Sequence, residues 1–339
     1  MRRIASGLIV IMSVLLVSCN GKTGNTITVG SDKLDNTQSY FSESMHKAAR
    51  CDSGYYYLDK CGASADNLMF YDDKSEESIV LCNKPQCGHD GEECMAYISG
   101  SEFKSELYYY NSYIYMISSK GNLVQISADG TQRTDLGSIC VLSGQDSVSM
   151  CFNDGYAYVS QEITGDIEGN VTVRLYRFNL DTGSSDKIYE ETGYGIGINS
   201  LKTYGSDTFF LKTSVSKDDK GLYSLEGKGI FRIAGEDIEC LLDKNVYSYC
   251  IDADNNKLYY SGLGDGMIYE YDLGSGKSES IYESDNDTGY FYITFDGNYI
   301  WMDDEGYKNM AMYFNKQSNS LDYTSVSYTH LTLPTNSLV

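Results

Sequence analysis

One strand pattern recurs six times along the chain and limits its possible folds more than any other feature. Each copy has an aromatic hairpin strand, a second strand, a turn of Asp, Gly and Asn, and a third strand. The second aromatic residue of the successive hairpins is Tyr57, Tyr115, Tyr158, Phe210, Tyr260 and Trp301, which gives spacings of 58, 43, 52, 50 and 41 residues. A period of this length built from short strands is typical of one β-propeller blade.

Side chains within the repeats alternate with period two, as strands require. Leu175 and Arg177 fall on one face, and Tyr176 and Phe178 on the other. Turn residues such as Asp129-Gly130 and Asp154-Gly155 separate the strands. We therefore predict an all-β propeller of at least six blades, at residues 45–82, 103–139, 147–190, 198–243, 246–283 and 289–324. Two β-sandwich domains are the alternative, and the single continuous period counts against them.

The turn strings resemble known repeats. Ile126-Ser127-Ala128-Asp129-Gly130-Thr131 and Phe178-Asn179-Leu180-Asp181-Thr182-Gly183 are similar to TolB-like and related uncharacterised propeller repeats of bacterial surface lipoproteins. The resemblance covers nearly the whole mature chain. It implies a propeller scaffold on which the function lies in the loops.

Residues 1–18 have the features of a secretion signal: two arginines, then an apolar segment too short for a membrane span. Leu16-Val17-Ser18-Cys19 resembles the lipobox of bacterial lipoproteins, which implies that Cys19 becomes a lipid-modified N-terminus. Residues 19–40 are polar and read as a flexible tether. These features predict a protein held at the cell membrane or cell surface, outside the cytoplasm, by lipid inserted into the bilayer.

The other end of the chain has a different character. Residues 325–339, from Ser325 to Val339, resemble a translated sequencing-library adapter. We therefore expect this segment to be an artefact that packs on nothing, and the propeller to be truncated at its C-terminal side.

Net charge limits the partners. With 26 Lys and Arg against 48 Asp and Glu, the formal charge is −22, which argues against a nucleic-acid partner. Tyrosine is abundant, at 32 residues. Strand propensity accounts for most of these tyrosines, and a minority could stack on sugars or peptides.

Cysteines cluster early in the chain. Besides Cys19, five of the ten lie between Cys51 and Cys94. Cys82, Cys87, His89 and Cys94 belong to a polar insertion, 82–94, placed after the first blade. We expect them to form a local staple, made either by disulfides or by zinc held by three thiolates and an imidazole. The extracytoplasmic compartment favours disulfides.

The sequence predicts no catalytic residues. His46 and His89 have no nucleophile signature beside them, and Gly193-Tyr194-Gly195-Ile196-Gly197 is not followed by a phosphate-loop lysine. Asp252-Ala253-Asp254 lacks the glycine and glutamate of a calcium loop, so we expect a hairpin turn there.

The prediction for function is a non-catalytic, membrane-anchored binding module for a glycan, peptide or envelope protein. The alternative is a propeller enzyme, a glycan hydrolase or lyase, with acids contributed by several blades. A sensing or assembly component of an envelope complex is a third possibility. Acids and aromatic residues from different blades converging on one channel mouth would favour the enzyme.

Overall fold

The computed structural model describes residues 48–100, 103, 106–143, 145–165, 169–205, 207–235, 237–283, 291–295, 298–304, 310–315, 318 and 320–325. Every regular element among them is a β-strand, which confirms the all-β class. No helix in these ranges is long and apolar enough to cross a membrane. The signal segment, Cys19, the tether, His46 and residues 326–339 lie outside the described residues.

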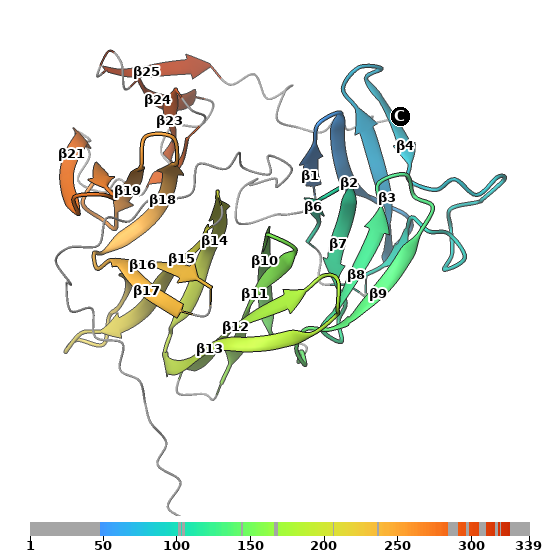
Figure 1. The fold of residues 1–339 in the computed structure, drawn as a ribbon, viewed down its shortest axis with the longest axis horizontal. Helices are drawn as coiled ribbons and strands as arrows, with labels where there is room; N and C mark the ends of the chain where they lie inside the picture. The colour runs from blue at the N-terminus through green and yellow to red at the C-terminus, as the bar shows by residue number, and fades with distance from the viewer. Residues whose placement is uncertain are drawn as a thin grey trace, which may run out of the picture.

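The strands form six antiparallel sheets, which we number blades 1 to 6 in chain order (Figure 1). Blade 1 contains β1 (Ala48–Cys51), β2 (Gly54–Lys60), β3 (Ala65–Asp72), β4 (Glu77–Val80) and β5 (Tyr97–Ser99). Blade 2 contains β6 (Tyr108–Tyr110), β7 (Tyr113–Ile117), β8 (Asn122–Ser127) and β9 (Arg133–Ser138). Blade 3 contains β10 (Ser147–Asn153), β11 (Tyr156–Thr164), β12 (Asn170–Asn179) and β13 (Ser185–Tyr194).

The remaining three blades repeat the same meander. Blade 4 contains β14 (Gly197–Tyr204), β15 (Asp207–Lys217), β16 (Tyr223–Ala234) and β17 (Asp237–Leu242). Blade 5 contains β18 (Val246–Asp252), β19 (Lys257–Gly262), β20 (Met267–Asp272) and β21 (Lys277–Glu283). Blade 6 contains β22 (Phe291–Phe295), β23 (Tyr299–Asp304), β24 (Met310–Asn315) and β25 (Ser320–Ser325). Ser325, expected to belong to the tail, pairs with Met310 as the last residue of β25.

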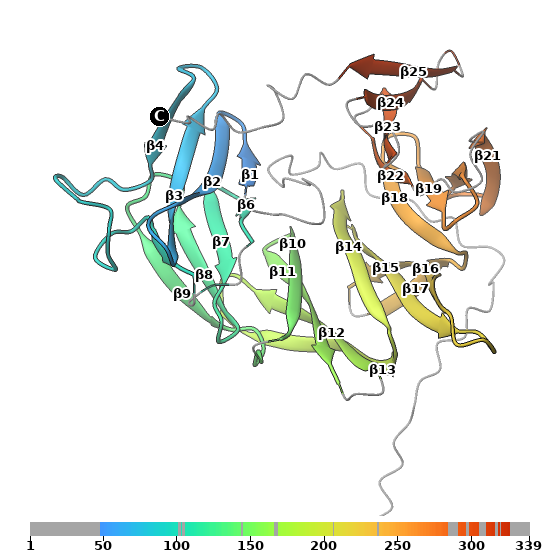
Figure 2. The same ribbon diagram turned by 180° about the vertical axis from the view of Figure 1, so that it is seen from behind.

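The six blades follow an arc. The first strands of successive blades contact one another in order, β1 with β6, then β10, β14, β18 and β22, so they line the inside of the arc. Figures 1 and 2 show blades 1 and 6 at its two ends, and no strand pairing joins them among the described residues. The described part of the propeller is therefore open.

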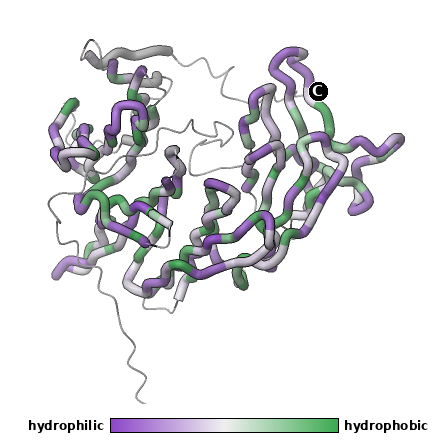
Figure 3. Tube along the Cα trace, viewed as in Figure 1, coloured by the Kyte–Doolittle hydropathy of each residue, from purple (hydrophilic) through white to green (hydrophobic). Residues whose placement is uncertain are grey.

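A blade inside the arc buries both of its faces against its neighbours, as blade 3 shows. Leu175 and Phe178 lie on opposite faces of β12, as the alternation predicts, and both are fully buried. Phe178 packs with residues of blade 2, whereas Leu175 packs with residues of blade 4. A blade thus needs a neighbour on each side to remove its apolar residues from water. In Figure 3 hydrophobic and hydrophilic colours alternate along the strands, and the loop that projects beyond β4 is mainly hydrophilic.

The turns follow the sequence prediction. Gly130, Gly155 and Gly183 have φ of 68°, 76° and 70°, the left-handed region that glycine enters without strain. Asp252 stabilises the turn between β18 and β19, because its carboxylate accepts a hydrogen bond from the N–H of Asn255 at 3.2 Å. That segment is a hairpin turn between β18 and β19 and not a calcium loop.

Tyrosine hydroxyls link neighbouring blades. Tyr56 donates to the Ala128 carbonyl at 3.1 Å, joining blades 1 and 2. The Tyr108 hydroxyl of blade 2 accepts from the Met150 N–H of blade 3 at 3.1 Å. Further along the arc, Tyr249 donates to the Ser200 carbonyl at 2.7 Å, and Tyr271 donates to the Leu241 carbonyl at 3.3 Å. The high tyrosine content thus serves the junctions between blades as well as strand formation.

Candidate metal centre in blade 1

The cysteine insertion interrupts the outer strand of blade 1. β4 pairs with the second half of β3, from Met69 to Asp72, and β5 pairs with the first half, from Ala65 to Asn67. The sequence placed the insertion after the blade, but β5 returns to the same sheet. The physical reason is backbone pairing: without β5, the first half of β3 would be an unpaired sheet edge.

Leu68 lies opposite the interruption and holds both sides of it. Its carbonyl accepts from the N–H of Leu81 at 2.9 Å, and its N–H donates to the carbonyl of Ala96 at 2.8 Å. The chain therefore leaves the sheet at Leu81 and rejoins it at Ala96. Cys82 is the first residue of the excursion, and Cys94 is close to its end.

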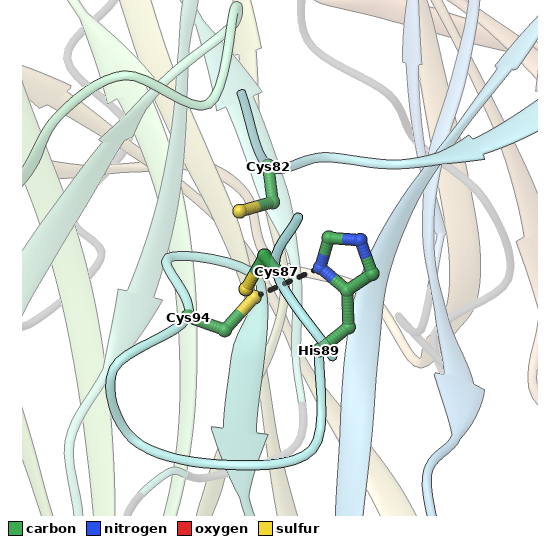
Figure 4. Close-up of side chains that lie close together, drawn as sticks. All are labelled: Cys82, Cys87, His89 and Cys94. Carbon is green, nitrogen blue, oxygen red and sulfur yellow. Dashed lines mark hydrogen bonds between the residues drawn. The ribbon is translucent and has the colours of Figure 1, made fainter. Parts of the chain in front are cut away.

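The excursion brings four ligand side chains together. The sulfurs of Cys82, Cys87 and Cys94 and a ring nitrogen of His89 all lie within 4.8 Å of one another. Figure 4 shows the four side chains pointing toward a common centre, with His89 Nδ1 3.3 Å from Cys94 Sγ. In a tetrahedral zinc site with Zn–S bonds of about 2.3 Å, neighbouring ligand atoms are about 3.7 Å apart. Such a centre needs only small further movements of these side chains.

The site lies at the edge of an apolar core. Cys94 is buried, whereas Cys82, Cys87 and His89 are half-buried. The three cysteines pack against the cluster that contains Leu68 and residues of blade 2. The other side of the loop is polar, with Glu92 and Glu93 exposed. A position with an apolar core on one side and water on the other suits cysteines that bind a structural metal better than cysteines that only fill space in the core.

Hydrogen bonds prepare one sulfur to be a thiolate. Burial acts to raise the pKa of Cys82, but the N–H groups of Lys84 and Met95 and the thiols of Cys94 and Cys87 donate to its sulfur. These donors outweigh burial, so that the pKa of Cys82 lies below its usual value. In metal sites, backbone N–H groups that donate to a cysteine ligand help to orient it and affect the metal affinity.

Cys94 is the opposite case. Burial is the main cause that raises the pKa of Cys94 to about 11; the N–H of Ala96 opposes it, and the neighbouring Cys82 and Cys87 add to it. Without a cation, Cys82 is therefore easier to ionise than Cys94, which keeps its proton. A bound cation would compensate the additional negative charge and let Cys94 ionise, since metal binding displaces thiol protons.

The loop backbone is constrained where it presents these ligands. Gln86 and His89 have φ of 59° and 56°, in the left-handed region that few residues other than glycine occupy. Cys87 lies between them, and its N–H donates to the Lys84 carbonyl at 3.3 Å. Non-glycine residues hold such conformations where surrounding contacts impose them, often at ligand sites.

The structure brings together all four residues that the sequence singled out. Cys82, Cys87 and Cys94 form no disulfide in this structure, and the choice between disulfides and a metal stays a prediction. Sequence reasoning missed a fifth residue, Cys61, whose thiol donates to the His89 carbonyl at 3.4 Å. Cys61 and His89 are 28 positions apart in the sequence, a separation that gives no spacing signal.

The carboxylates near the inside of the arc have partners in the fold. Glu162 of blade 3 accepts from the N–H of Ile198 in blade 4 at 3.1 Å, and burial raises its pKa. Asp207 pairs with Arg232 at 2.9 Å. Among the described residues, the cysteine loop is the one group of three or more His, Cys, Asp or Glu side chains arranged to hold a metal, and it lies in the outer strand of its blade.

Comparisons with known proteins show the fold. No family model matches the chain, and no curated protein matches it. An oligogalacturonate lyase in complex with manganese is similar, with a TM-score of 0.53 and 10% identity over 88% of this chain and 82% of the lyase. An oligogalacturonate lyase from Vibrio parahaemolyticus has a TM-score of 0.51 and 11% identity over 88% of this chain and 85% of its own. At this identity the likeness shows a β-propeller-like fold alone.

Proposed function

We propose that this chain is a membrane-anchored, extracytoplasmic β-propeller that binds a glycan, peptide or envelope protein without transforming it. We also propose that its cysteine loop holds one zinc ion as a structural staple. The observation that carries the proposal is the position and composition of the Cys82, Cys87, His89 and Cys94 cluster. It would fill all four positions of a tetrahedral metal with protein ligands, and it lies in the loop between β4 and β5 at the outer edge of blade 1. A closed site of this kind holds structure and leaves no position for a substrate.

Zinc accounts for the geometry better than a disulfide does. A disulfide joins two sulfurs and would leave the third cysteine and His89 without a role. A zinc ion uses all four, and the N–H groups directed at Cys82 support a thiolate. The polar loop has little to bury, so a metal bond replaces the core that it lacks.

The location of the protein rests on its N-terminal segment. The lipobox-like Leu16-Val17-Ser18-Cys19 supports acylation of Cys19, and residues 19–40 would let the propeller stand clear of the bilayer. The charge of −22 would repel an anionic lipid surface, so the lipid itself supplies the attachment.

One observation favours a second candidate, an enzyme acting on glycans. The two similar structures described above are oligogalacturonate lyases, and one of them is in complex with manganese. Manganese prefers oxygen and nitrogen ligands, whereas a site of three cysteines and one histidine suits zinc. The cysteine loop is therefore no equivalent of a manganese site, and an enzyme would need carboxylates such as Glu162 for catalysis.

A paired assay separates the two candidates. The purified lipid-free protein is first tested for binding to immobilised acidic and neutral glycans and cell-envelope peptides. It is then incubated with oligogalacturonate and manganese, and the ultraviolet absorbance of an unsaturated product is followed. We expect saturable binding to at least one ligand and no product. Product formation that Glu162→Gln abolishes would overturn the binding proposal in favour of the enzyme.

A further inference from the structure

A fifth cysteine contacts the loop without belonging to the ligand group. Cys61 lies in the turn between β2 and β3, and its Sγ–H donates to the backbone carbonyl of His89 at 3.4 Å. The turn is itself fixed, because the Cys61 N–H donates to the Ala65 carbonyl at 2.9 Å, and Gly62 has φ of 78°. Cys61 therefore offers a donor from a rigid part of the blade.

His89 is the ligand that most needs such support. Cys82 and Cys94 lie close to the two points where the chain joins the sheet, but His89 lies in the middle of the excursion. Its φ of 56° is unfavourable for a residue with a side chain. Among the described hydrogen bonds, the one from Cys61 is the single link between residues 83–93 and the strands or turns of the blade.

We infer that Cys61 is a positioning residue, which fixes the His89 backbone so that the imidazole faces the three sulfurs. The inference rests on the proposed zinc site. Cys61 donates to a backbone carbonyl and lies outside the group of four side chains whose ligand atoms are within 4.8 Å of one another, so we do not count it as a fourth sulfur ligand. Residues that orient metal ligands commonly change metal affinity without touching the metal.

The inference is tested with three variants of the full mature chain. Cys61→Ala removes the donor, and Cys61→Ser replaces it with a hydroxyl. Cys240→Ala serves as the matched control, because Cys240 is another half-buried cysteine but lies on β17 in blade 4. Zinc affinity is measured by competition with a chromophoric chelator. The visible spectrum of the cobalt(II) form reports the number of sulfur ligands.

We expect Cys61→Ala to bind one zinc about tenfold more weakly, near the lower end of the effect of residues that orient ligands. Cys61→Ser should recover most of the affinity, and Cys240→Ala should equal the wild type. The cobalt spectrum should keep the intensity of three sulfur ligands in all variants. The unfolding temperature of the metal-free protein should not change in Cys61→Ala, because the effect belongs to the metal site.

Two results would overturn the inference. Wild-type affinity in Cys61→Ala would show that His89 needs no such support, and loss of one sulfur–cobalt band would show that Cys61 is a ligand. Failure of the underlying zinc proposal looks different, because the wild-type protein itself would then bind no zinc.

Discussion

At the scale of single residues, Cys82, Cys87, His89 and Cys94 are the four side chains that lie within 4.8 Å of one another in the loop of blade 1. Their clustering in one short polar insertion of the sequence singled them out. It could not identify Cys61, because that contact depends on the β2–β3 turn lying beside the loop. Local composition thus predicted the ligand group, and only the tertiary fold showed what holds it in place.

Glycine turns supply a prediction at the same scale. Gly121 has φ of 86°, and a Cβ there would lie 2.0 Å from the Cys140 carbonyl oxygen. Gly155 has φ of 76° with open space around it. Gly155→Ala should therefore cost about 1 kcal/mol of unfolding free energy through backbone strain alone. Gly121→Ala should cost about 3 kcal/mol, because the strain and the clash add. Urea denaturation measures both, and equal costs would contradict the role of the carbonyl contact.

At the scale of strands and blades, the period of the aromatic hairpins and the alternation within strands predicted the sheets well. Leu175 and Phe178 are three positions apart in β12, so they lie on opposite faces of the strand and pack against different neighbouring blades. The return of β5 to β3 was missed, because an irregular insertion carries no periodic signal that sets a register. The hydrogen bonds between blades were missed too, since they join residues tens of positions apart, such as Tyr249 and Ser200.

Those bonds lead to a prediction about the junctions. Tyr249→Phe removes the hydroxyl that donates from blade 5 to the Ser200 carbonyl in blade 4. The loss should be about 1 kcal/mol of unfolding free energy, the usual net value of one hydrogen bond. Tyr57→Phe is the control, because Tyr57 is only partly buried and donates no described bond. A Tyr249→Phe protein as stable as the control would show that the hydroxyl does not hold the junction.

The junction of blades 3 and 4 should respond to pH. Burial raises the pKa of Glu162 in the folded state. When folding raises the pKa of a carboxyl group, the protonated group stabilises the folded state at a pH below its unfolded pKa. This stabilisation is lost as the pH rises through the folded pKa. The stability of wild type relative to Glu162→Gln should therefore fall as the pH rises above about 4, the usual pKa of an unfolded glutamate.

Glu190 provides the control with the opposite sign. Hydrogen bonds from Lys187 and Arg174 lower its pKa. Its contribution is present above the unfolded pKa and is lost as pH falls, so the stability of wild type relative to Glu190→Gln should rise with pH. Chemical denaturation at several pH values measures both slopes. Parallel slopes for the two variants would contradict the assignment of Glu162.

At the scale of the whole molecule, the described residues form an open arc of six sheets, for which we propose attachment by lipid and a zinc staple in blade 1. The attachment is tested in cells. Radiolabelled fatty acid should enter the wild-type protein, and Cys19→Ala should lose both label and membrane association, since stable anchoring needs the acyl chains. Equal labelling of Cys19→Ala would exclude Cys19 as the lipid site.

The zinc staple is tested most directly by the metal content and native mass of the purified protein, prepared without added reductant or chelator. We predict one zinc per chain, bound through Cys82, Cys87, His89 and Cys94 and lost in His89→Ala. Chelation should make the three thiols available to alkylation. A protein without zinc, lighter by two hydrogens because two of these cysteines form a disulfide, would contradict the account.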